Sequence, residues 1–210
     1  MISCFNERYM VKIGITGGIG SGKTTIAALL KDKGYPVYIA DSEASVLINT
    51  HPSIRKALTD QFGSSLYDKG VLNKKKLSDI IFKDKNALSL VNHIVHPVVM
   101  KDFIAWSQQQ RTNLVFFESA ILFEANLAAH FDVIICIYAS LQTRIERVRK
   151  RDGISPEKVM ERIKNQWSDE KKCQQSDFII YTDRDLDINR QTTEIVKRIE
   201  SKYFRSPESI

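Results

Sequence analysis

A glycine-rich segment near the N-terminus, GGIGSGKT from Gly17 to Thr24, has residue types and spacing suited to binding phosphate, and it fits G-x-x-x-x-G-K-[ST] without departure. Phosphates need many N–H donors at close range, and glycine exposes the backbone and tolerates the positive φ angles of a wrapping loop. Lys23 would reach the β- and γ-phosphates of ATP, and the Thr24 hydroxyl would coordinate Mg²⁺. The phosphate-binding residues expected from this pattern are Gly18, Ile19, Gly20, Ser21, Gly22, Lys23, Thr24 and Thr25.

The flanking sequence predicts the strand and the helix that such a loop requires. Residues 10–15 are typical of a short buried strand, and from Lys23 the apolar spacing becomes helical until about Gly34. The N-terminus of that helix would direct its partial positive charge at the bound anion. Residues 36–40 predict a second strand, which ends at Asp41. A chance glycine turn would not have this context, and the dinucleotide pattern G-x-G-x-x-G is not satisfied.

Asp41 could serve phosphoryl transfer or only helix formation. Ligands of parallel sheets bind at the carboxyl ends of the strands, so a carboxylate after the second strand should face the same crevice as the glycine-rich loop. There it could orient an attacking hydroxyl and accept its proton. Alternatively, Asp41 caps a helix that begins near Ser42. The spacing alone does not separate the two roles.

Arg144, Arg147 and Arg151 recur at steps of three and four residues and can therefore share one helix face. Arginines on a mobile lid can neutralise charge on a transferred phosphoryl group. The alternative is a solvated helix face paired with Glu146 and Asp152. Both interpretations stay open on spacing alone.

The remaining pattern predicts an α/β fold with a parallel sheet. Residues 53–110 show helical spacing with turns at Gly63 and Gly70, which indicates a helical lobe inserted between strands. Further strands are expected at 114–117, 133–138 and 178–180. A charged helical stretch is expected at 140–170, with an interruption near Gly153 to Pro156, and a closing amphipathic helix at 185–203.

Composition narrows the class of protein less than the motif does. The 210 residues are 43% hydrophobic and 27% charged, close to the average of globular domains. A formal charge of +6 and a pI near 9.2 favour an anionic partner such as nucleic acid, a membrane surface or a polyphosphate. A basic face that merely keeps the protein solvated explains the same charge.

Cysteine usage and hydropathy favour the cytoplasm. Cys4, Cys136 and Cys173 are odd in number and lack C-x-x-C spacing, which argues against a disulfide framework and a zinc site. The N-terminal segment MISCFNERY lacks an apolar stretch of signal-peptide length, and no segment approaches the roughly 18 continuous apolar residues of a membrane span.

Other P-loop classes fit less well. A switch GTPase should carry N-K-x-D, but Lys76 stands where the aspartate is required after Asn73-Lys74. The letters D-x-x-G occur at residues 60–63, where they end a helical pattern rather than a strand. A DNA-dependent motor would usually need a larger core. A small kinase is therefore favoured.

With these residues in place, the sequence resembles the dephospho-coenzyme A kinase family from Val11 to about Arg198. The likeness rests on several separate motifs: the loop segment IGITGGIGSGKTT, PVYIAD ending at Asp41, GVLNK with Leu77, NHIVHP from Asn92 to Pro97, AILFE from Ala120 to Glu124, and Arg147 to Gly153 followed by Arg162 and Gln166.

The resemblance implies transfer of the γ-phosphoryl group of ATP to the ribose 3′-hydroxyl of dephospho-coenzyme A, with Mg²⁺. It implies that Asp41 is the base, and that Lys23 of the loop and Arg147 of the lid are catalytic residues. Arg151 would be a further contact to the nucleotide. The implied acceptor-binding residues are Asp41, Lys74, Leu77, His96 and Pro97.

The implied architecture is a three-layer P-loop kinase fold with a parallel five-stranded sheet. One domain would span residues 10–205, with an acceptor-binding lobe at about 50–111, a lid at about 140–170 and an N-terminal extension at 1–9. The resemblance favours a cytoplasmic monomer or weak homo-oligomer that binds neither nucleic acid nor membranes.

Several residues depart from the pattern of that family and bear on fine substrate contacts: Ile39, Ser45, Asn73-Lys74, Ala120, Arg144 in place of a common Gln, and Thr182 in place of Asn. Another small-metabolite or nucleoside monophosphate kinase, or a P-loop binding module without phosphoryl transfer, stays an alternative.

Overall fold

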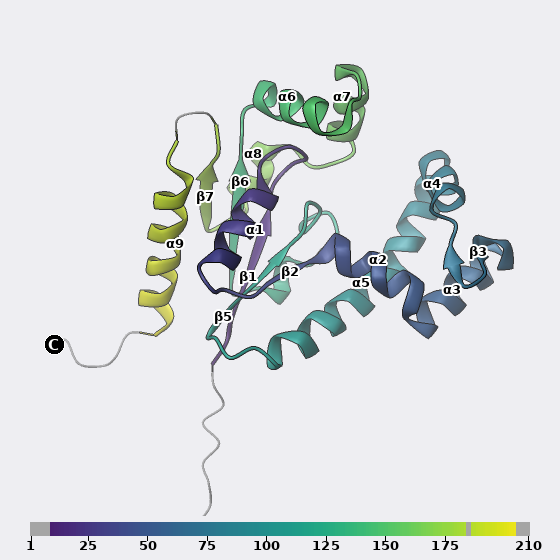
Figure 1. The fold of residues 1–210 in the computed structure, drawn as a ribbon, viewed down its shortest axis with the longest axis horizontal. Coiled ribbons are helices and arrows are strands. Elements are labelled where there is room, and N and C mark those ends of the chain that lie inside the picture. Colours follow the sequence, from purple (N-terminus) through teal and green to yellow (C-terminus); the bar gives the residue numbers. More distant parts are fainter. Residues whose placement is uncertain (1–8, 184–185, 205–210) are drawn as a thin grey trace, which may run out of the picture. The chain divides into compact units, whose positions relative to one another are not determined.

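The computed structural model describes residues 9–183 and 186–204, which divide into two compact units (Figure 1). The first unit comprises the described residues up to Val37 and those from Arg111 onward, and the second runs from Tyr38 to Gln110. The predicted extension at 1–9 and Cys4 lie outside the described residues, apart from Tyr9. Among the described helices, none has both the length and the apolar character needed to cross a membrane.

A five-stranded sheet forms the framework, as predicted. Its strand order is β2-β5-β1-β6-β7. β1 pairs in parallel with both β5 and β6, and β6 pairs in parallel with β7. The strands are β1 (Val11–Thr16), β2 (Val37–Ile39), β5 (Leu114–Glu118), β6 (Val133–Tyr138) and β7 (Phe178–Tyr181). Every residue of β5 is buried, which explains why its sequence is a continuous apolar run rather than an alternating one.

Helices of the first unit flank the sheet (Figure 1). They are α1 (Lys23–Asp32), α6 (Leu141–Asp152), α7 (Pro156–Lys164), α8 (Asp169–Gln174) and α9 (Ile188–Tyr203), with a 3-10 turn η2 (Ala128–His130). α6 ends at Gly153 in the left-handed conformation, and Pro156 starts α7, so the predicted interruption is confirmed. α9 begins later than the predicted residue 185, after the Asp187 side chain accepts a hydrogen bond from the Arg190 N–H.

The second unit is mainly helical. Its helices are α2 (Ala40–Thr50), α3 (Pro52–Phe62), α4 (Lys74–Lys83) and α5 (Lys85–Gln108), with a 3-10 turn η1 (Ser64–Leu66). Ile54, Leu58, Leu66 and Phe103 are fully buried and form the centre of its core. This unit begins at Tyr38 and therefore includes α2, whereas the lobe predicted from the sequence began at about residue 50.

A β-hairpin in the second unit was not predicted. β3 (Tyr67–Asp68) pairs antiparallel with β4 (Val71–Leu72). Lys69 and Gly70 connect them with φ values of 46° and 84°, and two successive positive φ angles are typical of a tight hairpin turn. Strands of two residues are too short to produce an alternating pattern, so only the turn at Gly70 was predicted correctly.

Two cysteines that are far apart in the sequence come together in the first unit. The Sγ atoms of Cys136 in β6 and Cys173 in α8 lie 3.3 Å apart, and both are free thiols. Burial is the main cause that raises the pKa of both thiols. The lack of C-x-x-C spacing in the sequence therefore did not indicate whether two cysteines lie close together in the fold.

Candidate active site

The glycine-rich loop connects β1 to α1 at the end of the sheet where α6 and α8 also lie (Figure 1). Gly20 has a φ of 80°, and Gly22, which precedes the first residue of α1, has a φ of 98°. Residues that carry a side chain rarely adopt these φ angles. A Cβ at Gly20 would also approach the Arg144 carbonyl oxygen to 2.7 Å. Glycine is therefore required at both positions for conformation, and at Gly20 for space as well.

The later half of the loop presents N–H groups to a ligand. Within the part of the chain that the structure describes, the N–H groups of Gly20, Gly22 and Thr24 donate to no protein acceptor. The Ser21 hydroxyl is buried and likewise without a hydrogen-bond partner there. Open donors at a helix N-terminus form an anion-binding site. Such a site fits the phosphates of a nucleotide.

Lys23 supplies the cation of the site. Its ammonium donates to the carbonyl oxygens of Gly17 at 2.9 Å and Gly18 at 3.2 Å, and the residue is only 9% exposed. The side chain thus turns back over the loop that carries it, where a bound phosphate would meet it. Burial makes this charge interact more strongly with a phosphate than it would in bulk water.

Oxygen ligands for a divalent cation are present at the same end of the first unit. Thr24 and Thr25 are exposed in the first turn of α1. Glu118 ends β5, is 6% exposed and pairs in register with Ile15 of β1, the strand that leads into the loop. Hydroxyl and carboxylate oxygens suit Mg²⁺. Glu118 was not among the predicted site residues, although a carboxylate at the carboxyl end of a buried strand could have indicated it.

The start of α6 is fixed to the end of the sheet by Asp183. Its carboxylate accepts hydrogen bonds from Ser140 N at 3.0 Å, Ser140 Oγ at 2.8 Å and Thr143 Oγ1 at 2.8 Å. Burial alone would raise the pKa of Asp183, but these hydrogen bonds outweigh it and lower the pKa. The first turns of α6, which carry two of the three arginines, are thereby anchored.

The three arginines of α6 occupy different environments. Arg147 donates to Thr182 Oγ1 at 2.9 Å and to the Thr182 carbonyl, and it lies 3.4 Å from the carbonyl oxygens of Gly20 and Ser21. Arg144 is 4% exposed, so the solvated-face interpretation is wrong for it. Arg151 is exposed and pairs with Asp152, as that interpretation expected. The loop thus gathers Arg144 and Arg147, but Arg151 binds elsewhere.

Asp41 lies in the second unit, in the first turn of α2. Helix α2 starts at Ala40, and no side chain caps it, so Asp41 is not the helix cap that the sequence allowed as an alternative. Asp41 is exposed, and its charge acts on His96 of α5. Burial lowers the pKa of His96, and Asp41 partly opposes that shift. The imidazole is therefore neutral at pH 7 and can accept or donate a hydrogen bond.

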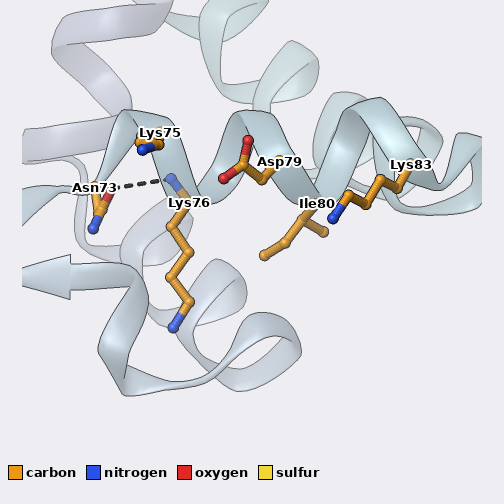
Figure 2. A pocket seen from close by; sticks show the side chains of 6 residues that line it. All are labelled: Asn73, Lys75, Lys76, Asp79, Ile80 and Lys83. Atoms are coloured by element: carbon orange, nitrogen blue, oxygen red, sulfur yellow. Dashed lines mark hydrogen bonds between the residues drawn. The ribbon is translucent and has the colours of Figure 1, made fainter.

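The other predicted acceptor contacts also lie in the second unit. Pro97 is exposed on α5, Lys74 is exposed at the start of α4, and Leu77 is buried within α4. The same helix lines a groove in which lysine ammonium groups predominate (Figure 2). Asn73 caps this helix by accepting a hydrogen bond from Lys76 N at 3.0 Å. The groove residues are Asn73, Lys75, Lys76, Asp79, Ile80 and Lys83.

This sheet order, with a phosphate-binding loop after the central strand, defines a P-loop kinase fold. A shikimate kinase from Acinetobacter baumannii shares the fold, with a TM-score of 0.50 at 15% identity over 94% of this chain and 97% of that one. The chain belongs to the dephospho-CoA kinase family, whose model, described as "Dephospho-CoA kinase", matches residues 11–187.

Individual relatives agree with this family. A dephospho-CoA kinase of Bacteroides fragilis is 41% identical over 91% of this chain and 94% of its own length. One from Porphyromonas gingivalis is 42% identical over 75% of this chain and 78% of its own. A solved structure from Thermus thermophilus has a TM-score of 0.81 at 29% identity, covering 91% of this chain and 98% of that one.

Proposed function

We propose that this chain transfers the γ-phosphoryl group of ATP to the ribose 3′-hydroxyl of dephospho-coenzyme A, forming coenzyme A and ADP. The observation that carries the proposal is the set of open N–H donors at Gly20, Gly22 and Thr24 beside the buried Lys23 ammonium. Membership in the dephospho-CoA kinase family supports the identity of the acceptor.

In the proposed reaction, the loop and Lys23 hold the β- and γ-phosphates and stabilise the charge that develops during transfer. Arg147, which already contacts the loop carbonyls, adds positive charge on the same side. Mg²⁺ bound through Thr24 would neutralise the phosphate oxygens. Asp41 accepts the proton of the attacking hydroxyl, which its exposed position in α2 permits.

Acceptor recognition belongs to the second unit in this proposal. Lys74, Leu77, His96 and Pro97 contact dephospho-coenzyme A; of these, Leu77 is buried within α4. The neutral imidazole of His96 serves as a hydrogen-bonding group rather than as a cation. We further propose that the enzyme acts in the cytoplasm as a monomer or weak homo-oligomer, independent of nucleic acid and membranes.

A panel of acceptors tests the proposal. The purified protein would be incubated with ATP, Mg²⁺ and either dephospho-coenzyme A, adenosine, a nucleoside monophosphate or shikimate, and ADP release would be measured. We expect release that depends on dephospho-coenzyme A, with coenzyme A as the product. Preference for another acceptor would indicate a different metabolite kinase. If no acceptor stimulated ADP release, the chain would be a nucleotide-binding module.

A further inference from the structure

The peptide groups between Gly17 and Gly20, at the start of the phosphate-binding loop, are bound by side chains from distant parts of the chain. Asp169 Oδ1 accepts a hydrogen bond from Gly18 N at 3.1 Å, and Gln166 Oε1 accepts one from Ile19 N at 2.9 Å. Arg144 Nε donates to the Ile19 carbonyl at 2.9 Å. Two N–H groups and one carbonyl of this short stretch are therefore engaged by side chains of the protein itself. We call Arg144, Gln166 and Asp169 the loop clasp.

An ion pair joins two members of the loop clasp. The Arg144 guanidinium binds Asp169 Oδ2, and the two side chains are 5% and 6% exposed. Burial lowers the pKa of Arg144, which shows how far this group is removed from water. Separating the pair would leave a buried charge without its partner, which costs far more than breaking an exposed ion pair. Arg144 is therefore held where it lies.

The loop clasp also depends on glycine at position 18. A Cβ there would lie 2.3 Å from Arg144 Nη2 and 2.6 Å from Asp169 Oδ1. Real Cβ atoms do not approach other atoms this closely, so any side chain would displace the ion pair. Gly18 is consequently needed for the close approach of the guanidinium and the carboxylate to the backbone.

The segment that supplies Gln166 and Asp169 is itself fixed. Lys172 is fully buried, donates to the Ala120 carbonyl at 2.5 Å and pairs with Glu124 at 2.9 Å. Glu124 also accepts a hydrogen bond from Trp167 N at 2.8 Å. The loop clasp is thus tied to the chain that follows β5, and its groups cannot move independently.

From these contacts we infer that Arg144, Gln166 and Asp169 are positioning residues. They hold the start of the loop so that the donors of Gly20, Gly22 and Thr24 face the nucleotide in a fixed geometry. The guanidinium of Arg144 acts on the loop rather than on the transferred phosphate. A loop ordered in advance loses less entropy when the nucleotide binds. The inference rests on the proposed function in one respect, namely that this loop binds the phosphates of the nucleotide.

A double-mutant cycle on the ion pair tests the inference. The variants are Arg144→Gln, Asp169→Asn and the combination of both, with Arg149→Gln as the control because Arg149 is exposed on the same helix. The readouts are the dissociation constant of a fluorescent ADP analogue without acceptor, kcat and KM for ATP, and the melting temperature. We expect each single variant to weaken ADP binding by about tenfold, since a loop that is no longer ordered in advance loses more entropy when the nucleotide binds.

The double variant decides between positioning through the pair and independent contributions. Two neutral amides can replace the ion pair, so we expect ADP binding to recover at least about fivefold relative to the product of the single effects. Additive losses, or single variants with unchanged ADP binding, would overturn the inference. If a single variant does not fold, Gln166→Ala removes one hydrogen bond without exposing a buried charge and should still weaken ADP binding. Unchanged binding in that variant would also overturn the inference.

The failure of this inference and that of the proposed function are distinguishable. ADP binding is measured without any acceptor, whereas the proposed function is tested by turnover of dephospho-coenzyme A in the wild type and in Arg149→Gln. A wild type that binds ADP but does not turn over this acceptor would contradict the function alone. A wild type that turns it over, with additive losses in the cycle, would contradict the loop clasp alone.

Discussion

The charged side chains of the two units are held in different ways. Around the loop of the first unit, Arg144, Asp169 and Lys172 are 4%, 6% and 0% exposed, and each has a charged partner. In the second unit, Asp41 and most of the lysines in the groove of α4 are exposed (Figure 2). The candidate nucleotide site is therefore built from buried, paired charges, whereas the charged groups expected to bind the acceptor, Asp41 and Lys74, are exposed.

This difference predicts two kinds of mutational effect. Substitutions around the loop should disturb a connected network and affect nucleotide binding and turnover together. Substitutions of exposed groups in the second unit should leave nucleotide binding intact and affect only the steps that involve the acceptor. The predictions that follow test this contrast in order of decreasing effect.

Lys23→Ala should cause the largest loss. The ammonium donates to two carbonyl oxygens of the loop. Electrostatic groups that stabilise a transferring phosphoryl group contribute about 10³-fold or more to turnover. We expect kcat to fall by about this factor while the circular dichroism spectrum persists. Lys31→Ala, an exposed substitution on the same helix, is the control. Unchanged turnover in Lys23→Ala would remove the phosphate site from this loop.

Asp41→Asn should rank second and should separate the two units. Loss of a general base costs about 10²-fold or more in kcat. Because Asp41 belongs to the second unit, the dissociation constant of ATP should stay within about twofold, in line with surface substitutions. Steady-state kinetics and nucleotide titration measure the two quantities, with Asp60→Asn as an exposed control. A collapse of ATP binding without a specific loss in kcat would make Asp41 structural.

Arg147→Ala should lower kcat/KM by about tenfold at low salt, since it removes one charge-assisted contact near the phosphates. The variant also loses the hydrogen bonds to Thr182, so ATP binding should weaken as well. Arg149→Ala on the same helix serves as the control. Equal activity of the two variants would return Arg147 to the class of solvated helix residues.

Lysines in the groove of α4 should produce the smallest kinetic effect. Exposed charges attract an anionic acceptor only weakly and are screened by salt. Lys75→Ala combined with Lys83→Ala should raise KM for dephospho-coenzyme A by about threefold or less and leave KM for ATP unchanged. An effect on KM for ATP would contradict the division of roles between the two units.

Protonation of His96 should appear in the pH dependence of stability. Because burial lowers the pKa of His96 in the folded state, the unfolded chain binds the proton more tightly. The stabilising contribution is complete above the ordinary histidine pKa near 6.5 and is lost as the pH falls below it. Thermal unfolding between pH 7 and pH 5 should therefore show a steeper loss of stability in the wild type than in His96→Gln. Parallel profiles would show that His96 is solvated.

The framework could be predicted because local sequence determines it. Buried parallel strands produce continuous apolar runs, and the residues of β6 were predicted without error. The loop was equally predictable, since the need for bare backbone and one ammonium fixes residue types at fixed spacing. The hairpin of the second unit was not predicted because its two-residue strands are too short to show an alternating hydrophobic pattern.

The loop clasp could not be predicted for a different reason. Asp169 and Gly18 are 151 residues apart, and no spacing rule links a buried carboxylate to a backbone N–H so far away. Arg144 was noted as one of three arginines on a helix face and as a departure from the family pattern, but neither observation pointed to Asp169. Lys172 gave no signal at all, because lysine is normally exposed. Such contacts follow from the packing of α6 and α8 and require the structure.

The most direct test follows the backbone amides of the loop by NMR while Mg²⁺–ADP is added to the ¹⁵N-labelled protein. A hydrogen bond to a phosphate oxygen deshields an amide proton. We predict large downfield shifts for Gly20, Gly22 and Thr24, whose donors are open, and small shifts for Gly18 and Ile19, which stay bound to Asp169 and Gln166. Resonances of the whole loop that do not move, or that move most at Gly18 and Ile19, would contradict this assignment of the nucleotide site.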